Sequence, residues 1–284
     1  MSSSNYFPTV DIFATQHFAE LVKEAASALG IAINHLDHNL AATELCSAAK
    51  QSSVITFIDA PPNLALINLL EREQIKCAPA SKLLKKFPGQ ISISTSDRRL
   101  HVLVARSPHG QIASWTPASI LHDRLQQMVV VPAPDISESE LEIAQNYAIK
   151  LAGDLGLIGV LNLEIEMSNI EPNLTNLEYG PNRLGLWTLH GSITSQFEQH
   201  LRAILDLPLG DTALRSKWTV TGDIQVGDKQ DMYRPYLHLM ARTPEMKFWQ
   251  SLEGGFLSIS GDELTYLKNE IEHARLYFKG DIEE

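Results

Sequence analysis

The chain has 284 residues, 44% of them hydrophobic, and a formal net charge of -11. This length and composition predict a hydrophobic core and two or three domains of modest size. The acidic balance argues against nucleic acid or an anionic membrane as a partner. No apolar run approaches the roughly 20 residues that a membrane-spanning helix needs. The start MSSSNYFPTVDIF lacks a signal-peptide pattern, so we expect none.

The two cysteines, Cys46 and Cys77, are isolated and show no CxxC spacing. This usage predicts neither a structural disulfide nor a cysteine zinc site, and it fits a reducing, cytoplasmic location. We expect both thiols to pack as small apolar groups.

The first 87 residues alternate between strand and helix patterns. We predict strands at 10–13, 31–36, 54–58 and 75–77, and helices at 15–29, 63–73 and 81–86. Because this βαβ order is typical of a small parallel sheet, range 1–87 is interpreted as a separate N-terminal domain.

The middle of the chain changes to antiparallel patterns. The spacing of Ser137 and Glu140 predicts a capping box that opens a helix running to about Leu155. A second helix lies within Gly191–Gly210 and ends near Pro208. Further strands are predicted at 90–105, 111–115, 129–131, 158–167, 174–179, 218–220, 237–240 and 256–259, followed by a last helix at 262–277.

The segment GSITSQFEQHLRAILDLPLG, Gly191–Gly210, closely resembles the helix and exit turn near the end of the ATP-grasp fold in 5-(carboxyamino)imidazole ribonucleotide synthases of the PurK type. The strands RLHVLVAR and IGVLNLEIEM resemble further segments of this purine-biosynthesis family. The resemblance implies an α/β fold with a Rossmann-like (pre-ATP-grasp) domain at 1–87. A truncated ATP-grasp domain with an antiparallel sheet would follow at 88–210, and a small β-rich domain with a terminal helix at 211–284.

The same resemblance places Glu164 where the family has its first magnesium-binding glutamate. The family's Asn-Glu pair falls on Thr175-Asn176, so the second metal carboxylate is replaced by an amide. Its His-Asn-Ser loop falls on Asn182-Arg183-Leu184, and the glycine that follows is kept as Gly185. The polar loop that binds substrate in the family is therefore changed.

Two more family segments differ at the ends of the chain. The glycines of the first strand–helix turn, which let a phosphate approach the backbone, fall on Phe13-Ala14-Thr15. The Arg-Lys pair beside the substrate phosphate falls on Phe248-Trp249. The chain also passes from SKLLKKF through Pro88-Gly89 directly into the central strands, without the glycine-rich subdomain that clamps ATP in the family.

Alternation along the strands places Asn162, Glu164 and Glu166 on one face, and Asn176 and Glu178 on one face of the next strand. If these strands pair, Glu164, Glu166 and Glu178 are candidate metal ligands, because neighbouring carboxylates attract Mg²⁺. The alternative is a solvated sheet face. By family match alone, the candidate ligand-pocket residues are Gln16, Arg106, His238 and Arg242, and Mg and ATP are the implied cofactors. No catalytic residue is assigned.

These patterns leave two hypotheses open, with a third as a variant. In the first, a divergent homologue does not bind ATP in the usual way and acts as a non-catalytic or regulatory partner. It would form a homodimer or a heteromer with a full-length family member and could bind a small ribonucleotide. In the second, an ATP-dependent ligase remains, with Lys82, Lys85 and Lys86 as the nearest basic cluster. The third is a nucleotide-binding sensor without turnover.

Overall fold

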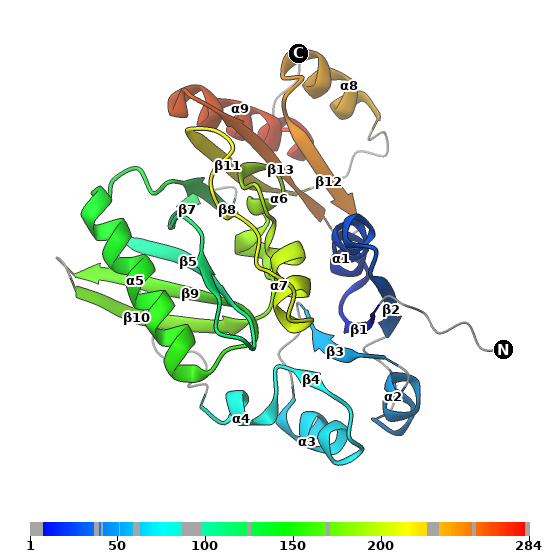
Figure 1. Cartoon of the computed structure of the whole chain (residues 1–284). Helices are drawn as coiled ribbons and strands as arrows, with labels where there is room; N and C mark the ends of the chain where they lie inside the picture. The colour runs from blue at the N-terminus through cyan, green and yellow to red at the C-terminus, as the bar shows by residue number, and fades with distance from the viewer. Residues whose placement is uncertain are drawn as a thin grey trace.

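The computed structural model describes residues 8–36, 40, 42–50, 52–58, 63–86, 98–123, 126–168, 171–225, 233–251 and 254–281. Two β-sheets organise these residues, a four-stranded parallel sheet and a nine-stranded sheet (Figure 1). The expected α/β class, with one parallel and one antiparallel sheet, is confirmed.

The parallel sheet contains the N-terminal strands in the order β2-β1-β3-β4. Helix α1 packs its buried residues, among them Phe18 and Val22, on this sheet, and Gly30 ends the helix in the left-handed conformation that suits glycine. The strands are β1 (Thr9–Phe13), β2 (Ala32–Leu36), β3 (Val54–Phe57) and β4 (Cys77–Ala78), and the helices are α1 (Gln16–Leu29), α2 (Ala42–Ala49), α3 (Leu64–Arg72) and α4 (Ser81–Leu84).

The large sheet runs in the order β10-β9-β5-β7-β8-β11-β13-β12, with β6 paired to β5. Its strands are β5 (Arg99–Arg106), β6 (Ile112–Ser114), β7 (Ala118–Asp123), β8 (Gln126–Val131), β9 (Gly159–Ser168), β10 (Glu171–Tyr179), β11 (Trp218–Ile224), β12 (Lys247–Ser251) and β13 (Gly254–Gly261). Because β11 pairs with β8, the strands of range 211–284 continue the sheet of range 88–210. The predicted domain boundaries remain predictions.

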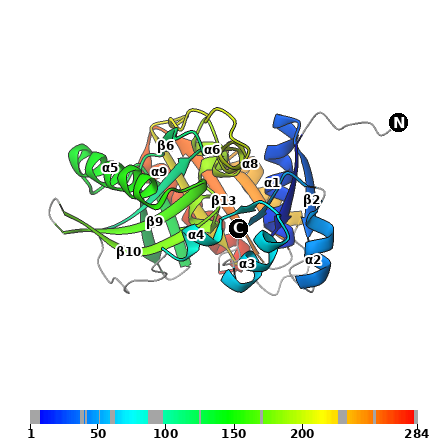
Figure 2. The same ribbon diagram turned by 60° about the horizontal axis from the view of Figure 1, so that its bottom comes forward.

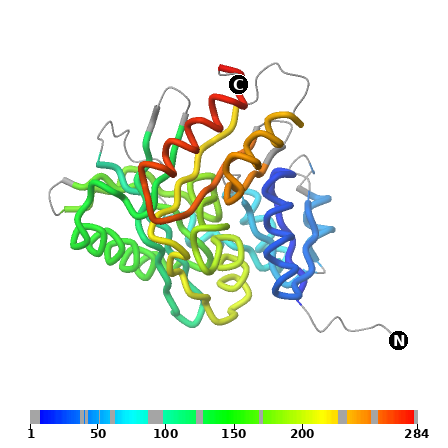
Figure 3. The backbone as a smooth tube through the Cα atoms, turned by 90° about the horizontal axis from the view of Figure 1, so that it is seen from above, coloured from blue at the N-terminus to red at the C-terminus, as the bar shows by residue number. Residues whose placement is uncertain are grey.

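Helices α5 (Glu138–Leu155) and α9 (Leu264–Lys279) cover the same face of the large sheet. The register places Leu100 beside Ser119, Ser119 beside Val130 and Val130 beside Val220, so these residues share one face. Leu100 packs in the core under α5, whereas Val130 and Val220 pack under α9. Figure 3 shows both helices from above. The capping box predicted for Ser137 and Glu140 is confirmed.

The opposite face of the large sheet meets the turn η1 (Arg183–Gly185) and helices α6 (Thr188–Gly191) and α7 (Gln196–Ile204). Helix α1 packs on α7 through Phe18 and Phe197, whose ring centroids lie 5.8 Å apart. A single hydrophobic cluster therefore joins the two sheets. Figure 2 shows α5 and the parallel sheet at opposite ends of the molecule.

The predicted strand at 237–240 is wrong, because these residues belong to helix α8 (Tyr233–Arg242). Pro235 and Leu239 are buried four residues apart, which is helical spacing, and proline is tolerated in a first helical turn. Helix α2 and strands β7 and β12 were not predicted. Residues 90–97 of the predicted strand 90–105 lie outside the described ranges. Among the described helices, none is long and apolar enough to cross a membrane.

Candidate functional site

A polar cluster lies on strands β5, β9 and β10 of the large sheet, on the face opposite α5. Its members are His101, Asn162, Glu164, Asn176 and Glu178. The register sets Glu164 beside both His101 and Asn176, and Glu178 beside Asn162. The two acidic strands β9 and β10 pair, and this brings Glu164 and Glu178 to neighbouring positions on one face.

The side-chain amide of Asn176 lies between the two carboxylates of the polar cluster. Its Nδ2 donates to Glu164 Oε1 at 3.0 Å and to Glu178 Oε1 at 3.1 Å. Its Oδ1 accepts from the backbone N–H of Leu177 at 2.9 Å, which fits this orientation of the amide. The side chain of Asn176 thus donates two hydrogen bonds to carboxylate oxygens. The family resemblance implies a metal-binding carboxylate at this position instead.

His101 and Asn162 form the buried end of the polar cluster. Asn162 Nδ2 donates to the carbonyl of Gly180 at 2.5 Å, so its Oδ1 accepts from His101 Nε2 at 2.9 Å. The ring is therefore the neutral tautomer with its proton on Nε2. Burial lowers the pKa of His101 to about 4, although Asn162 and Glu178 act in the opposite direction.

Glu166, the third candidate metal ligand, lies two positions along β9 beside Arg99 and Asn173. Within the described parts of the chain, no three His, Cys, Asp or Glu side chains form a group able to hold a metal. Asn176 links Glu164 and Glu178 by hydrogen bonds, whereas Glu166 lies two residues further along β9. The metal site at these three glutamates stays a prediction.

The turn that follows β10 is held by the buried side chain of Gln196 at the start of α7. Gln196 Nε2 donates to the carbonyl of Asn182 at 2.8 Å, and its Oε1 accepts from the Asn182 N–H at 3.1 Å. A Cβ on Gly185 would lie 2.6 Å from Gln196 Cδ. The Gln196 side chain therefore fills the space that a side chain at position 185 would need. Packing against Gln196 explains why a glycine stands there.

Arg183 binds the same turn to the C-terminal strands. Its Nε donates to Asp223 Oδ1 of β11 at 2.9 Å, and its Nη2 donates to the carbonyl of Gly255 at 3.3 Å. Asn182 Nδ2 donates to Glu178 Oε2 of the polar cluster at 2.8 Å. In this chain, the side chains of the loop that binds substrate in the family are therefore hydrogen-bonded to other residues of the same chain.

The turn between β1 and α1 is filled by side chains. Ala14 is buried, and its carbonyl is hydrogen-bonded to His35 Nε2 at 2.8 Å. Gln16, the family-matched residue of this turn, is exposed and donates to Glu20 Oε1 at 2.9 Å. A Cβ stands at position 14, where the family resemblance implies a glycine that admits a phosphate.

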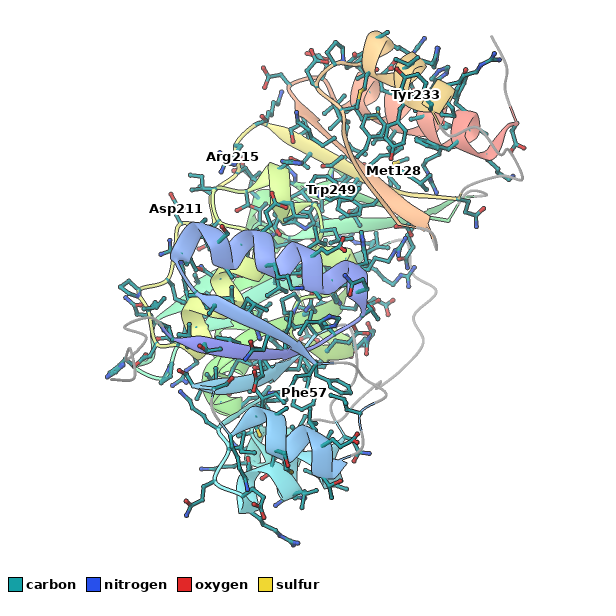
Figure 4. All side chains as sticks on the ribbon, turned by 90° about the vertical axis from the view of Figure 1, so that its right-hand side faces the viewer. Phe57, Met128, Asp211, Arg215, Tyr233 and Trp249 are labelled. Carbon is teal, nitrogen blue, oxygen red and sulfur yellow. The ribbon has the colours of Figure 1, made fainter. Side chains whose placement is uncertain are left out.

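An aromatic stack takes the place of the family's Arg-Lys pair. Trp249 of β12 lies parallel to Phe256, with centroids 4.4 Å apart and planes at 8°, and His190 of α6 lies 4.4 Å from the Trp249 ring. Figure 4 shows Trp249 above helix α1. The pKa of His190 is lowered to about 4, first by burial and then by the cations Lys247 and Arg215.

The other family-matched residues take part in separate networks. Arg106 donates to the carbonyl of Leu157 at 2.9 Å and so ties the end of β5 to the turn before β9. On α8, Arg242 makes two 2.9 Å hydrogen bonds to Glu270 of α9, and His238 contacts His273 of α9. Their ligand-binding role stays a prediction.

A cavity of about 260 Å³ opens between α4 and the C-terminal end of α5. Lys82 and Lys86 line it together with Asp154 and Ile158. Lys86 Nζ donates to the carbonyls of Asp154 and Leu155 at 3.2 and 3.4 Å, so this lysine also caps α5.

The sequence and the fold are similar to known proteins. An ATP-grasp domain model matches residues 94–197. N5-carboxyaminoimidazole ribonucleotide synthase of Mycobacterium tuberculosis (strain H37Rv) is 39% identical over 156 residues, which are 53% of this chain and 36% of the relative. The Corynebacterium ammoniagenes synthase is 38% identical over 138 residues, 46% of this chain and 33% of the relative.

Solved structures show the same fold. N5-carboxyaminoimidazole ribonucleotide synthetase of Thermus thermophilus matches with a TM-score of 0.79 at 18% identity, over 97% of this chain and 99% of that chain. N5-carboxyaminoimidazole synthase of Aspergillus clavatus, in complex with ADP and 5-aminoimidazole ribonucleotide, matches with a TM-score of 0.76 at 15% identity, over 94% and 98% of the two chains.

Over about half of its length, this chain is similar to N5-carboxyaminoimidazole ribonucleotide synthases. It spans about a third of the length of the curated synthases that it matches. Residues 85–98 alone separate α4 from β5. The absence of the ATP-clamping subdomain stays a prediction, which this spacing supports because a βαβ unit needs about 30 residues.

Sequence reasoning missed His101, and it missed the ion pair of Arg183 with Asp223. His101 is the one polar residue between the two arginines of the strand RLHVLVAR. A lone polar residue in an apolar strand is a usable signal of a buried polar role. Its partner Asn162 lies on β9 and is identified only by the register between the strands. Within α7, Arg202 Nε donates to Glu198 Oε1 at 2.8 Å.

Proposed function

We propose that this synthase homologue does not catalyse ATP-dependent carboxylation and acts as a structural or regulatory partner in purine biosynthesis, in the cytoplasm. The observation that carries the proposal is the position of Asn176 between Glu164 and Glu178. An amide is neutral and presents N–H donors to the carboxylates, whereas phosphoryl transfer needs cations that neutralise charge on the nucleotide.

Three further contacts support the proposal. The ion pair of Arg183 with Asp223 occupies the substrate loop, Ala14 fills the first turn, and Trp249 stacks where the family has a basic pair. The few residues between α4 and β5 support the predicted absence of an ATP-clamping subdomain. The partner is proposed to be a second copy of this chain or a full-length synthase.

A turnover assay tests the proposal. The purified protein is mixed with aminoimidazole ribonucleotide, bicarbonate and Mg-ATP, and phosphate release is compared with that of a full-length synthase. We expect no release above the protein-free rate, and co-purification with the full-length enzyme from a common host. Substrate-dependent ADP release would overturn the proposal.

The alternative is an ATP-dependent ligase that holds its phosphates differently. The cavity lined by Lys82 and Lys86 is the observation that favours it, because two ammonium groups lie at one opening. Lys82→Ala would then abolish phosphate release. Thermal stabilisation by the ribonucleotide without turnover would instead indicate a sensor, since a ligand that binds only the folded state raises its stability.

A further inference from the structure

The cavity between α4 and the C-terminal end of α5 shares no residue with the polar cluster. Its volume is about 260 Å³, and Figure 1 shows α4 beside the lower end of α5. Leu83 contributes to its wall from α4, whereas Leu155 and Ile158 contribute from the end of α5 and from the residues before β9. The cavity therefore has an apolar wall on each side.

Two glycines keep this cavity open. An added Cβ on Gly153 or on Gly156 would meet no atom within 4 Å, and both residues line the cavity. Pockets that bury drug-sized ligands have volumes of about 300–1,000 Å³. The present volume lies below that range, so the cavity fits an occupant smaller than a nucleotide.

The backbone at the end of α5 offers the cavity no unpaired acceptor. The last four carbonyls of this helix are those of residues 152–155. The carbonyls of residues 152 and 153 accept from the N–H of Gly156, and those of residues 154 and 155 accept from Lys86 Nζ. Helix ends commonly leave such carbonyls to water or to a ligand. Here they are already satisfied, which disfavours a cationic occupant.

Two lysines supply hydrogen-bond donors instead. An ammonium group has three N–H donors, and Lys86 uses two of them on the carbonyls of α5, so one is left. Lys82 lines the cavity and has no ion pair with any residue that the structure describes. The donors at the cavity thus outnumber the acceptors, which favours an anionic occupant.

The charge at the cavity selects a single negative charge. Lys82, Lys86 and Asp154 are the charged side chains that line it. Two ammonium groups and one carboxylate leave one net positive charge, which a monoanion complements. A dianion such as phosphate would be repelled by Asp154 and would leave the apolar walls in contact with water. A carboxylate with a short hydrocarbon chain satisfies both features.

The cavity is held in shape without an occupant. Ser81, which precedes Lys82, donates from its N–H and its hydroxyl to the two carboxylate oxygens of Glu71, at 2.8 and 2.6 Å. On the other side, the hydroxyl of Tyr179 donates to the carbonyl of Ile158 at 2.7 Å. A site that is ordered before binding loses less entropy when a ligand enters.

We propose that this cavity binds a small monocarboxylate with a short apolar chain. The carboxylate accepts from Lys82 and from the remaining N–H of Lys86, and the chain packs between the apolar walls. The inference goes beyond the proposed function, because it requires neither ATP nor a partner chain. Binding would stabilise the contact between α4 and α5, since a ligand that binds only the folded state stabilises it.

The test is a saturation-transfer NMR titration of the full chain with hexanoate, in the absence of ATP and Mg²⁺. We expect saturable binding. Hexanamide has the same chain without the charge and should bind at least about threefold more weakly, as the loss of an exposed ion pair implies. Inorganic phosphate has charge without the chain and should not displace hexanoate at equal concentration.

Two variants test the head and the chain of the ligand separately. Lys82→Ala should weaken hexanoate binding by at least about threefold and leave hexanamide binding unchanged. Gly153→Leu places a side chain in the cavity and should abolish the binding of both. Lys150→Ala is the matched control, because Lys150 is an exposed lysine of α5 that does not line the cavity.

The proposal is overturned if hexanoate does not bind the wild type, if hexanamide binds as tightly, or if phosphate displaces hexanoate at equal concentration. It is also overturned if Lys82→Ala and Gly153→Leu, both folded by circular dichroism, bind hexanoate as tightly as the Lys150→Ala control does.

Discussion

His200 of α7 donates from Nε2 to the hydroxyl of Thr56 on β3 over 2.8 Å, and this bond joins the two sheets. The N–H of Val160 donates to His200 Nδ1 at 3.1 Å, so the ring is neutral with its proton on Nε2. Thr56 in turn donates to the carbonyl of Ala78 at 2.8 Å. Burial lowers the pKa of His200 to about 3.

Substitution of this ring should destabilise the contact between the sheets. His200→Ala removes a fully buried ring and leaves Val160 N–H without its acceptor, so we expect the free energy of unfolding to fall by about 2–4 kcal/mol. Urea denaturation measures the change, with the exposed His109→Ala as control. Equal stability of the two variants would contradict a structural role for His200.

Acid should weaken the fold through the buried histidines. An unfolded histidine has a pKa near 6.5, whereas folding lowers the pKa of His101 to about 4 and that of His200 to about 3. Below about pH 6.5 the unfolded chain binds protons that the native chain excludes. The free energy of unfolding should then fall by up to about 1.4 kcal/mol per pH unit for each ring.

Urea denaturation at about pH 7 and about pH 5 measures this slope. The variant His200→Asn lacks one of the histidine rings whose pKa is lowered by folding, so its stability should decrease less over the same interval. A wild-type stability that stays level down to about pH 5 would show that these rings titrate normally.

The two glycines Gly185 and Gly153 should respond oppositely to alanine. Gly185→Ala places a Cβ against Gln196 and should lower the free energy of unfolding by about 1–3 kcal/mol. Gly153 lies inside α5, with no described neighbour within 4 Å of an added Cβ, so Gly153→Ala should raise it by about 0.5–1 kcal/mol. Thermal denaturation compares the pair. Equal effects would contradict the packing role of Gly185.

Local patterns were sufficient to predict most elements of the fold. The helical spacing of α1 and the capping box of α5 depend on neighbouring residues, and both are present in the structure. The four-residue run at Leu237–Met240 was too short to separate strand from helix, and only the burial of Pro235 and Leu239 decides it.

The candidate site was predictable only in part. Alternation put Glu164 and Glu178 on polar faces, but the bridge by Asn176 required the register of β9 with β10. His200 and Thr56 are 144 positions apart in sequence, so no local pattern could pair them. The contact of His238 with His273 likewise depends on how α8 packs on α9.

The claim that Asn176 replaces a metal carboxylate is tested most directly by calorimetry, in which the wild type and Asn176→Glu are each titrated with Mg²⁺. The variant exchanges an amide for a third carboxylate between Glu164 and Glu178. Neighbouring carboxylates attract Mg²⁺. Asn269→Glu adds the same charge to an exposed position on α9 and serves as the control.

We predict binding heat for Asn176→Glu, and none for the wild type or for Asn269→Glu. Mg²⁺ binding by the wild type that is lost in Glu164→Gln would contradict the account that Asn176 has taken the place of a metal carboxylate.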